Sequence, residues 1–270
     1  MQKKIEAVRR QYEKYPYPAI PWVATPGRND LQTLIPPVDL KRNPRICVAG
    51  SGTFEPIVFA KAFPRSRVTA VDLSQTSLNR CLLRGLIARK FIHTVRADLH
   101  DDLSHRLGVF DYVACTGVLH HTPTPELMLS QIVKLMSPRS VLRLMIYADE
   151  SREPVREVQK FFKEKNLTTE SDDLFQKCHA LIAELDSHHP FRKTFEHYTD
   201  SQTPSGLIDG FFHACENRLS LRTLRKICET NELQFLGTAN ADLKIASWDE
   251  LAAIDTRREL SVNPVLWLQK

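Results

Sequence analysis

Apolar and polar positions follow two alternating periods from residue 45 to residue 147. Short apolar runs predict strands near 45–49, 67–72, 91–96, 110–115 and 139–147. Apolar residues spaced three or four positions apart predict helices near 55–63, 75–89 and 125–136. Because strands that alternate with helices usually pair in parallel through right-handed crossovers, this region predicts a parallel sheet covered by helices.

The segments on either side have different patterns. Residues 1–14 predict a short amphipathic helix, which the proline-rich stretch from Pro16 to Pro37 ends. The period from Glu153 to Thr230 is helical, with polar breaks at 166–171, 187–190 and 199–205, and indicates an inserted helical cap.

The last part of the chain predicts one more helix and two more strands. The helix begins at Ser220 and has Leu221, Leu224, Ile227 and Cys228 on one face, and the strands lie at 233–237 and 265–268. We therefore expect four parts: an N-terminal helix and arm (1–40), an α/β core (41–150), the cap (151–219), and a C-terminal helix with closing strands (220–270).

The most informative residues lie where the first two strands of the core end. The apolar run 46–49 is followed by Gly50-Ser51-Gly52, and the next strand ends at Asp72. Glycines directly after a strand permit a tight turn and the close approach of a ligand. An acidic residue about 20 positions later suits the two hydroxyls of a ribose, so this spacing indicates a nucleoside-binding crevice.

Glu55 argues against a dinucleotide in this crevice. The dinucleotide fingerprint has a third glycine at this position, and a carboxylate in the first helical turn opposes a pyrophosphate there. S-adenosylmethionine has no phosphate and carries a cationic sulfonium, so Glu55 is no obstacle to it. A nicotinamide-linked oxidoreductase stays open as an alternative.

Five segments in order resemble class I S-adenosylmethionine-dependent methyltransferases. They are 46–53, 71–74, Arg96-Ala97-Asp98-Leu99, 110–121 and 127–147. The resemblance extends to the arm at 11–18 and to 235–237 and 267–270, which are similar to one bacterial branch of uncharacterised methyltransferases. It implies an α/β, Rossmann-like fold with a mostly parallel seven-stranded sheet, a helical cap insertion and one antiparallel strand in the last pair.

The resemblance also implies S-adenosylmethionine as the cofactor and a set of contacts to it. In the family an Asp placed like Asp98 accepts a hydrogen bond from the adenine amino group. The expected cofactor-binding residues are Gly50, Ser51, Gly52, Asp72, Leu73, Asp98, Leu99, Thr116 and Tyr15. Asp72 is available for the ribose because Ser74 is the better N-cap for the helix that starts at Gln75.

Three departures from the family pattern keep a catalytically silent relative open as an alternative. Phe54 replaces a small residue, Val48 stands where an acidic residue is common, and the usual Pro-Gly-Gly turn reads Pro138-Arg139-Ser140. Such a relative would act by binding the cofactor or a partner.

Candidates for catalysis and acceptor binding follow the fourth and fifth strands and lie in the arm. A histidine near the methyl group is a natural base, and His121 is the expected catalytic residue. The expected substrate contacts are Tyr17, His120, His121 and Tyr147. The alternative for the histidines is that they shape the loop, and for the tyrosines that they cover the sheet edge or pack in the core.

Composition adds few constraints. The chain has 270 residues, 42% of them apolar, which is enough for a sizeable core. Its net charge of +5 is dispersed, so an RNA partner has weak support and a small-molecule methyl acceptor is preferred, with RNA or protein as alternatives. The acceptor atom and the oligomeric state stay open.

The sequence has no apolar run of membrane-spanning length and no signal-peptide pattern, so we expect a cytoplasmic protein. The six cysteines are far apart and predict buried free thiols. We expect no metal, because the spacings of His188, His189, His197 and His213 match no common ligand pattern.

Overall fold

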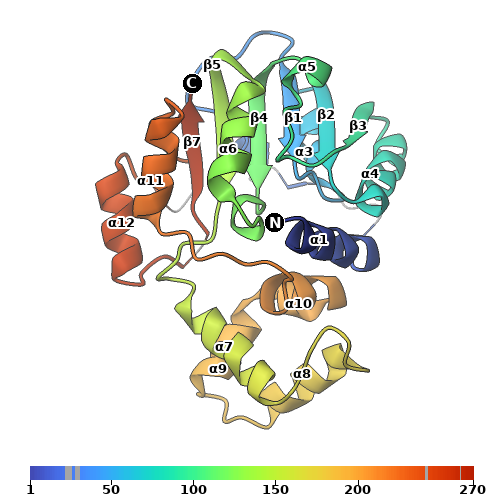
Figure 1. Ribbon diagram of the computed structural model, residues 1–270, viewed down its shortest axis with the longest axis vertical. Coiled ribbons are helices and arrows are strands. Elements are labelled where there is room, and N and C mark those ends of the chain that lie inside the picture. Colours follow the sequence, from blue (N-terminus) through green and yellow to red (C-terminus); the bar gives the residue numbers. More distant parts are fainter. Residues whose placement is uncertain (22–25, 28–30, 241–242, 262) are drawn as a thin grey trace.

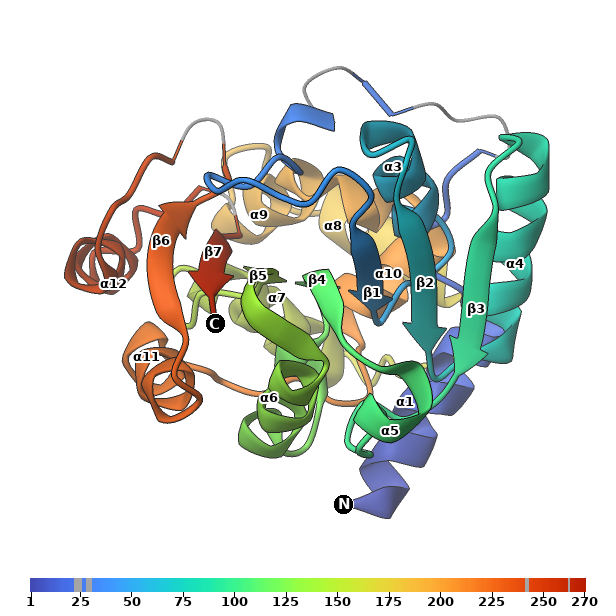
Figure 2. The same ribbon diagram turned by 90° about the horizontal axis from the view of Figure 1, so that it is seen from above.

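The computed structural model describes residues 1–21, 26–27, 31–240, 243–261 and 263–270. Within them, seven strands form a sheet in the order β3-β2-β1-β4-β5-β7-β6 (Figures 1 and 2). Among these strands β7 runs opposite to the other six, so its pairings with β5 and β6 are antiparallel and the remaining pairings are parallel. The bounds are β1 Arg45–Ala49, β2 Arg67–Asp72, β3 Ile92–Arg96, β4 Phe110–Thr116, β5 Met136–Met145, β6 Gln234–Thr238 and β7 Val265–Gln269. This confirms the predicted Rossmann-like sheet.

The register of the sheet brings the predicted site residues to one edge. Ala49 of β1 pairs with Val71 of β2 and with Cys115 of β4. The residues that follow these three, among them Gly50 and Asp72, therefore lie level at the carboxyl edge.

Helices cover both faces of the sheet. One face holds α3 (Glu55–Ala62) and α4 (Gln75–Ile87), and the other holds α6 (Pro125–Lys134), α11 (Leu221–Thr230) and α12 (Trp248–Thr256), with the short α5 (Ser104–Leu107) nearby (Figure 2). Ser74 caps α4 and Ser220 caps α11 through their side chains, as predicted.

Helix α12 is missing from the sequence prediction. Its apolar residues have little amphipathic period, but Ser247 caps it by accepting the Glu250 N–H. The Ser-x-x-Glu spacing is the signal that could have identified this helix.

The predicted start of β5 at 139 is wrong, because the strand begins at Met136 and continues through an irregularity. Arg139 has a φ of 64° and donates its backbone N–H to the Lys270 carbonyl at 3.0 Å. The Pro138-Arg139-Ser140 segment is thus a bulge inside the strand, at the end opposite the glycine loop. Pairing with the C-terminal strand overrides the turn signal.

We expect Arg139→Gly to raise the free energy of unfolding by up to about 1 kcal/mol, because glycine removes the cost of left-handed backbone. Urea denaturation measures this change. Affinity for S-adenosylhomocysteine should stay within twofold of wild type, since the bulge lies away from the carboxyl edge. A larger loss of affinity would contradict this placement.

The cap consists of α7 (Glu153–Glu164), α8 (Leu174–Ala183), α9 (Pro190–His197), the short η2 (Thr199–Gln202) and α10 (Pro204–Phe211). It has its own apolar cluster, which includes Phe162, Phe195 and Phe211. Helix α1 (Gln2–Lys14) lies between α10 and the carboxyl edge of the sheet (Figure 1). The boundaries of the four predicted parts stay predictions.

Helix α1 and the arm after it are fixed to the core by hydrogen bonds. Thr53 donates its backbone N–H to the Tyr17 carbonyl at 3.1 Å, and Gln75 donates its N–H to Glu13 Oε1 at 2.9 Å. The first 18 residues therefore form one wall over the carboxyl edge.

All six cysteines are free and buried, as predicted. Among the residues that the structure describes, none belongs to a helix with the length and apolar content needed to span a bilayer.

Candidate functional site

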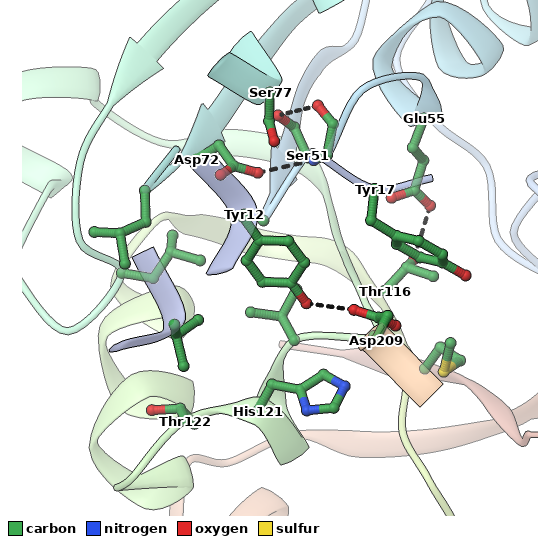
Figure 3. Close-up of a pocket in the computed structure, with 18 of the residues that line it drawn as sticks. Tyr12, Tyr17, Ser51, Glu55, Asp72, Ser77, Thr116, His121, Thr122 and Asp209 are labelled. Atoms are coloured by element: carbon green, nitrogen blue, oxygen red, sulfur yellow. Dashed lines mark hydrogen bonds between the residues drawn. The ribbon is translucent and has the colours of Figure 1, made fainter. Parts of the chain in front are cut away.

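A cavity of 460 Å³ opens at the carboxyl edge, between the sheet, α1 with its arm, and α10 (Figure 3). The strand ends supply one part of its lining, and the arm and cap supply the rest. Nearly all the predicted cofactor-binding residues line it: Gly50, Ser51, Gly52, Asp72, Leu73, Asp98, Leu99 and Thr116. The cavity thus has a cofactor end defined by the sheet and a second end defined by the cap.

Gly50 and Gly52 hold left-handed conformations, with φ of 70° and 54°. A Cβ at Gly52 would lie 2.8 Å from the Tyr17 carbonyl oxygen, and one at Gly50 would lie 2.2 Å from Val118 Cγ2. Any other residue would strain the loop and displace the wall that closes over it.

Asp72 is held by the loop that it faces. Its carboxylate accepts the backbone N–H groups of Gly52 and Ser74, each at 2.8 Å. Burial raises the pKa of Asp72 to about 6, and the hydrogen bonds from Ser74 and Gly52 oppose this shift. The remaining acceptor capacity of the carboxylate suits the hydroxyls of a ribose.

Asp98 lies at the same end and is oriented by His100. His100 contacts Asp98 Oδ1 through Nδ1 at 2.6 Å and through its backbone N–H at 3.0 Å. Burial alone would raise the pKa of Asp98, but the hydrogen bonds from His100 hold it below its ordinary value. Leu73 and Leu99 provide apolar lining beside these carboxylates. The combination fits a nucleoside, with apolar contacts for a base and carboxylates for its polar groups.

Two charged residues that the sequence analysis did not count among the cofactor contacts, Glu55 and Arg143, also line the cavity. Glu55 accepts a hydrogen bond from Thr116 Oγ1 at 2.7 Å and lies 3.5 Å from Arg143 Nη1. Arg143 also donates to Thr116 Oγ1 at 3.0 Å. Burial raises the pKa of Glu55, while Arg143 and Thr116 oppose that shift. One guanidinium beside one carboxylate matches the zwitterionic amino-acid group of S-adenosylmethionine.

We expect Arg143→Met to weaken binding of S-adenosylhomocysteine about 10- to 100-fold, because one charge-assisted hydrogen bond is lost. Binding of 5′-methylthioadenosine, which lacks the amino-acid group, should change by less than threefold. Calorimetric titration with both ligands measures the difference. The double variant Glu55→Gln/Arg143→Met is the control, because in it no buried carboxylate is left without its cation. Equal losses of affinity for the two ligands would contradict the assignment of Arg143 to the amino-acid group.

A chain of hydrogen bonds defines the cap end of the cavity. Tyr12 donates its hydroxyl to Asp209 Oδ1 at 2.7 Å (Figure 3). His213 Nε2 lies 3.0 Å from the same hydroxyl. His213 Nδ1 accepts the Cys215 N–H at 3.0 Å. Burial lowers the pKa of His213 far below its ordinary value, so the ring is neutral and its proton is on Nε2.

His121, the predicted catalytic residue, lines the cavity beside this chain. It is 5% exposed, and its Nδ1 lies 3.0 Å from the Cys215 carbonyl, to which it donates. Its Nε2 therefore carries the lone pair, and it has no hydrogen-bond partner among the described residues. Burial and the neighbouring His120 lower the pKa of His121 well below its ordinary value. The catalytic role of His121 stays a prediction.

Two predicted contacts are not placed in the cavity. Tyr15 follows the last turn of α1 and packs against the apolar cluster of the cap, whereas Tyr12, one turn earlier, lines the cavity. His120 is fully buried and stacks on Tyr147, with ring centres 3.8 Å apart. Neither Tyr15 nor His120 is among the described residues that line the cavity, and their contacts to cofactor and substrate stay predictions. Tyr17 and Tyr147 do line the cavity.

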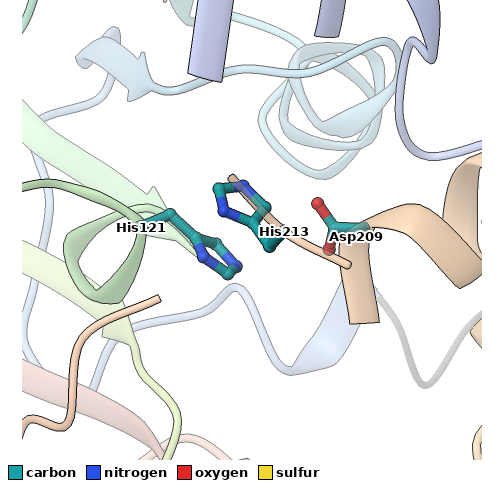
Figure 4. Close-up of side chains that lie close together, drawn as sticks. All are labelled: His121, Asp209 and His213. Carbon is teal, nitrogen blue, oxygen red and sulfur yellow. The ribbon is translucent and has the colours of Figure 1, made fainter. Parts of the chain in front are cut away.

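Within the described part of the chain, His121, Asp209 and His213 are close enough together to be compared with a metal site (Figure 4). Their hydrogen bonds favour another arrangement. His213 Nε2 bears a proton directed at Tyr12, and the two imidazole rings stack at 3.6 Å with an angle of 20° between their planes. In-plane lone pairs of stacked rings do not converge on one ion, so the geometry favours a hydrogen-bonded relay.

The charged residues that sequence reasoning missed had a visible signal. Asp209 interrupts the apolar run Leu207-Ile208-Asp209-Gly210-Phe211, and Arg143 interrupts the strand Val141-Leu142-Arg143-Leu144. Charged residues inside apolar runs are almost never fully buried without a partner, so each marks a candidate site.

Comparison with known proteins agrees with this geometry. Residues 49–142 match the family model described as a methyltransferase domain. An uncharacterized protein of Synechococcus sp. is 28% identical over 208 residues, which cover 74% of this chain and 49% of that protein.

Two solved structures show the same fold. PKMT2 from Rickettsia typhi in complex with AdoHcy has a TM-score of 0.62 at 17% identity, over 93% of this chain and 54% of that one. The plantazolicin methyltransferase BpumL in complex with SAH has a TM-score of 0.50 at 13% identity, over 100% and 98% of the two chains. The present chain spans about half the length of the Synechococcus protein and of PKMT2.

The domain match covers the glycine loop, Asp72, Asp98 and the end of β4, which are the residues that define the cofactor end of the cavity. The similarity to one bacterial branch stays a prediction. Residues 49–142 are therefore similar to a methyltransferase domain, and the whole chain shares a Rossmann-like fold with these solved structures.

Proposed function

We propose that this protein transfers a methyl group from S-adenosylmethionine to a small-molecule acceptor bound between the core and the helical cap. The observation that carries the proposal is the single cavity that joins the cofactor end to side chains of the arm and the cap. AdoHcy and SAH in the two solved structures named above support the choice of cofactor.

The residues at the cofactor end fit this group. Asp72 would hold the ribose and Asp98 the adenine, while Arg143 and Glu55 would hold the carboxylate and ammonium of the amino-acid group. The bound cofactor supplies a methyl group on a cationic sulfur. Methyl transfer is a displacement, so the protein mainly has to position the acceptor and exclude water. Burial of the loop by Tyr17 and Pro18 supports water exclusion.

Enclosure of the second end supports a small molecule over RNA or a large protein surface. Tyr12 comes from α1, Tyr17 from the arm, and Asp200 and Asp209 from the cap, so side chains from separate parts of the chain surround the space. The catalytically silent alternative receives less support, because Phe54 lines an open cavity and Arg139 lies away from it.

The test is an activity screen with trideuteromethyl S-adenosylmethionine. The protein and Asp72→Ala are incubated separately with a metabolite extract, and mass spectrometry records small molecules that gain a trideuteromethyl group. A label that appears only with wild type supports the proposal. Label found only in RNA or protein fractions contradicts the small-molecule acceptor.

A further inference from the structure

The cap end of the cavity has an unusual chemical lining. Asp200 of η2 and Asp209 of α10 face it together with Tyr12, Tyr17 and His121. Asp209 is only 5% exposed, and so is His121. Burying a carboxylate without a cation or hydrogen-bond donor costs free energy. The two carboxylates therefore indicate a ligand that supplies a positive charge or hydrogen-bond donors.

The hydrogen bonds in this lining leave acceptor atoms available and few donors. Tyr12 donates its hydroxyl proton to Asp209, and His213 donates its Nε2 proton to the Tyr12 hydroxyl. Tyr17 donates to Asp200, and His121 Nδ1 donates to the Cys215 carbonyl. The atoms left to meet a ligand are therefore carboxylate oxygens, and the His121 Nε2 beside them is buried and has no hydrogen-bond partner among the described residues.

A group with several donors and no acceptor fits this lining best. An ammonium group meets this description, whereas a hydroxyl has one donor and two lone pairs that would need donors in return. A ring nitrogen of His121 and a carboxylate oxygen of Asp209 lie within 4.8 Å of each other. A tetrahedral nitrogen making two hydrogen bonds of about 2.9 Å would hold its acceptors about 4.7 Å apart.

The charge balance points the same way. Among the described residues, Arg152 is the cation whose charge lowers the pKa of both carboxylates. Its guanidinium donates two hydrogen bonds to Glu216, at 2.8 and 3.1 Å, and one to the Gly210 carbonyl. In the described part of the chain no cation forms an ion pair with Asp200 or Asp209, and burial raises the pKa of both. The faces of Tyr12 and Tyr17 add a further attraction for a cation.

We propose that the methyl acceptor is a primary or secondary amine, which binds as its ammonium ion among Asp209, Asp200 and His121. This inference rests on the proposed function. Asp209 takes one proton from the ammonium, which frees the nitrogen lone pair. The nitrogen then forms a bond to the methyl carbon as the carbon–sulfur bond breaks, and that electron pair stays on sulfur. The methylated product carries the positive charge that the sulfonium loses.

Calorimetric titration of the S-adenosylhomocysteine-loaded protein with three probes of similar size tests the inference. The probes are n-butylammonium chloride, n-butanol and sodium butyrate at pH 8. We expect n-butylammonium to bind at least tenfold more tightly than n-butanol, and butyrate to bind least. Asp209→Asn and Asp200→Asn should each weaken n-butylammonium binding at least tenfold. Asp186→Asn, which removes an exposed charge of the cap, should not change it.

The first titration, with S-adenosylhomocysteine alone, separates the two failures. Absence of that binding in folded protein counts against the proposed function. If S-adenosylhomocysteine binds normally but n-butylammonium does not bind, or binds no better than n-butanol, only the amine inference is overturned. Unchanged loading of Asp209→Asn shows that this variant is folded.

Free amines and lysine side chains carry the same chemical group. Turnover of free n-butylamine and of a lysine-containing peptide, followed by mass spectrometry, distinguishes these sources. Methylation of the free amine agrees with the enclosed cavity. Methylation of the peptide alone would agree with an amine acceptor but would contradict the proposal that the acceptor is a small molecule.

Discussion

Asp209→Asn is expected to lower kcat for methyl transfer to an amine about 100- to 10,000-fold, the range for losing a general base. Asn has nearly the same shape as Asp and can still accept the Tyr12 hydroxyl, but it cannot take a proton from the acceptor. Affinity for S-adenosylhomocysteine should stay within twofold, because the cofactor end contains none of these contacts. Single-turnover kinetics and calorimetry on the same preparations measure the two quantities.

The pH dependence gives a readout that a purely structural role for Asp209 would not produce. Burial raises the pKa of Asp209 to about 7, and only the ionised form can accept a proton. In wild type, kcat should therefore rise with pH through about 7, and in Asp209→Asn this limb should disappear. If the variant kept the limb and more than a tenth of wild-type kcat, Asp209 would not be the base.

Asp72→Ala is expected to weaken S-adenosylmethionine binding about 100- to 10,000-fold. Hydrogen bonds from two ribose hydroxyls to a charged group contribute about 1.5–3 kcal/mol each, and the loop also loses the acceptor for the Gly52 and Ser74 amides. Titration calorimetry measures the loss. Asp101→Ala, at an exposed position outside the cavity, is the matched control and should bind normally.

The sign of the pH effect on binding follows from the raised pKa of Asp72, about 6 in the free protein. The ionised carboxylate is the better acceptor for hydroxyls, so affinity should fall as pH drops through about 6 and level off above 7. In Asp72→Ala the affinity should lose this dependence. An equal dependence in both proteins would assign it to another group.

The cofactor end was predictable from sequence because its features are local. Gly50 and Gly52 follow a strand directly, Asp72 ends the next one, and the parallel register places all three at one edge. The strand and helix periods were enough to order these elements, and the glycine and aspartate motifs identified the cofactor-binding residues. For the same reason Ser74 could be identified as the cap of α4 before its hydrogen bond was seen.

The cap end was not predictable in the same way, because its contacts join distant parts of the chain. Tyr12 and Asp209 are 197 positions apart, and Tyr12 and His213 are 201 apart. Neither distance leaves a spacing pattern in sequence.

Neighbouring residues of one type were also hard to separate. Tyr12 faces the cavity and Tyr15 does not, because α1 ends at Lys14 and the chain then changes direction. His120 and His121 share one short 3₁₀ turn, where successive side chains point to different sides. Their assignment needed the structure.

The most direct test of the central claim is titration of the wild-type protein with S-adenosylmethionine, S-adenosylhomocysteine and NADH. We expect S-adenosylmethionine and S-adenosylhomocysteine to bind in the micromolar range, about −8 kcal/mol. We expect no binding of NADH, because Glu55 is buried beside the glycine loop where a pyrophosphate would dock. Binding of NADH, or no binding of either S-adenosyl compound by folded protein, would contradict it.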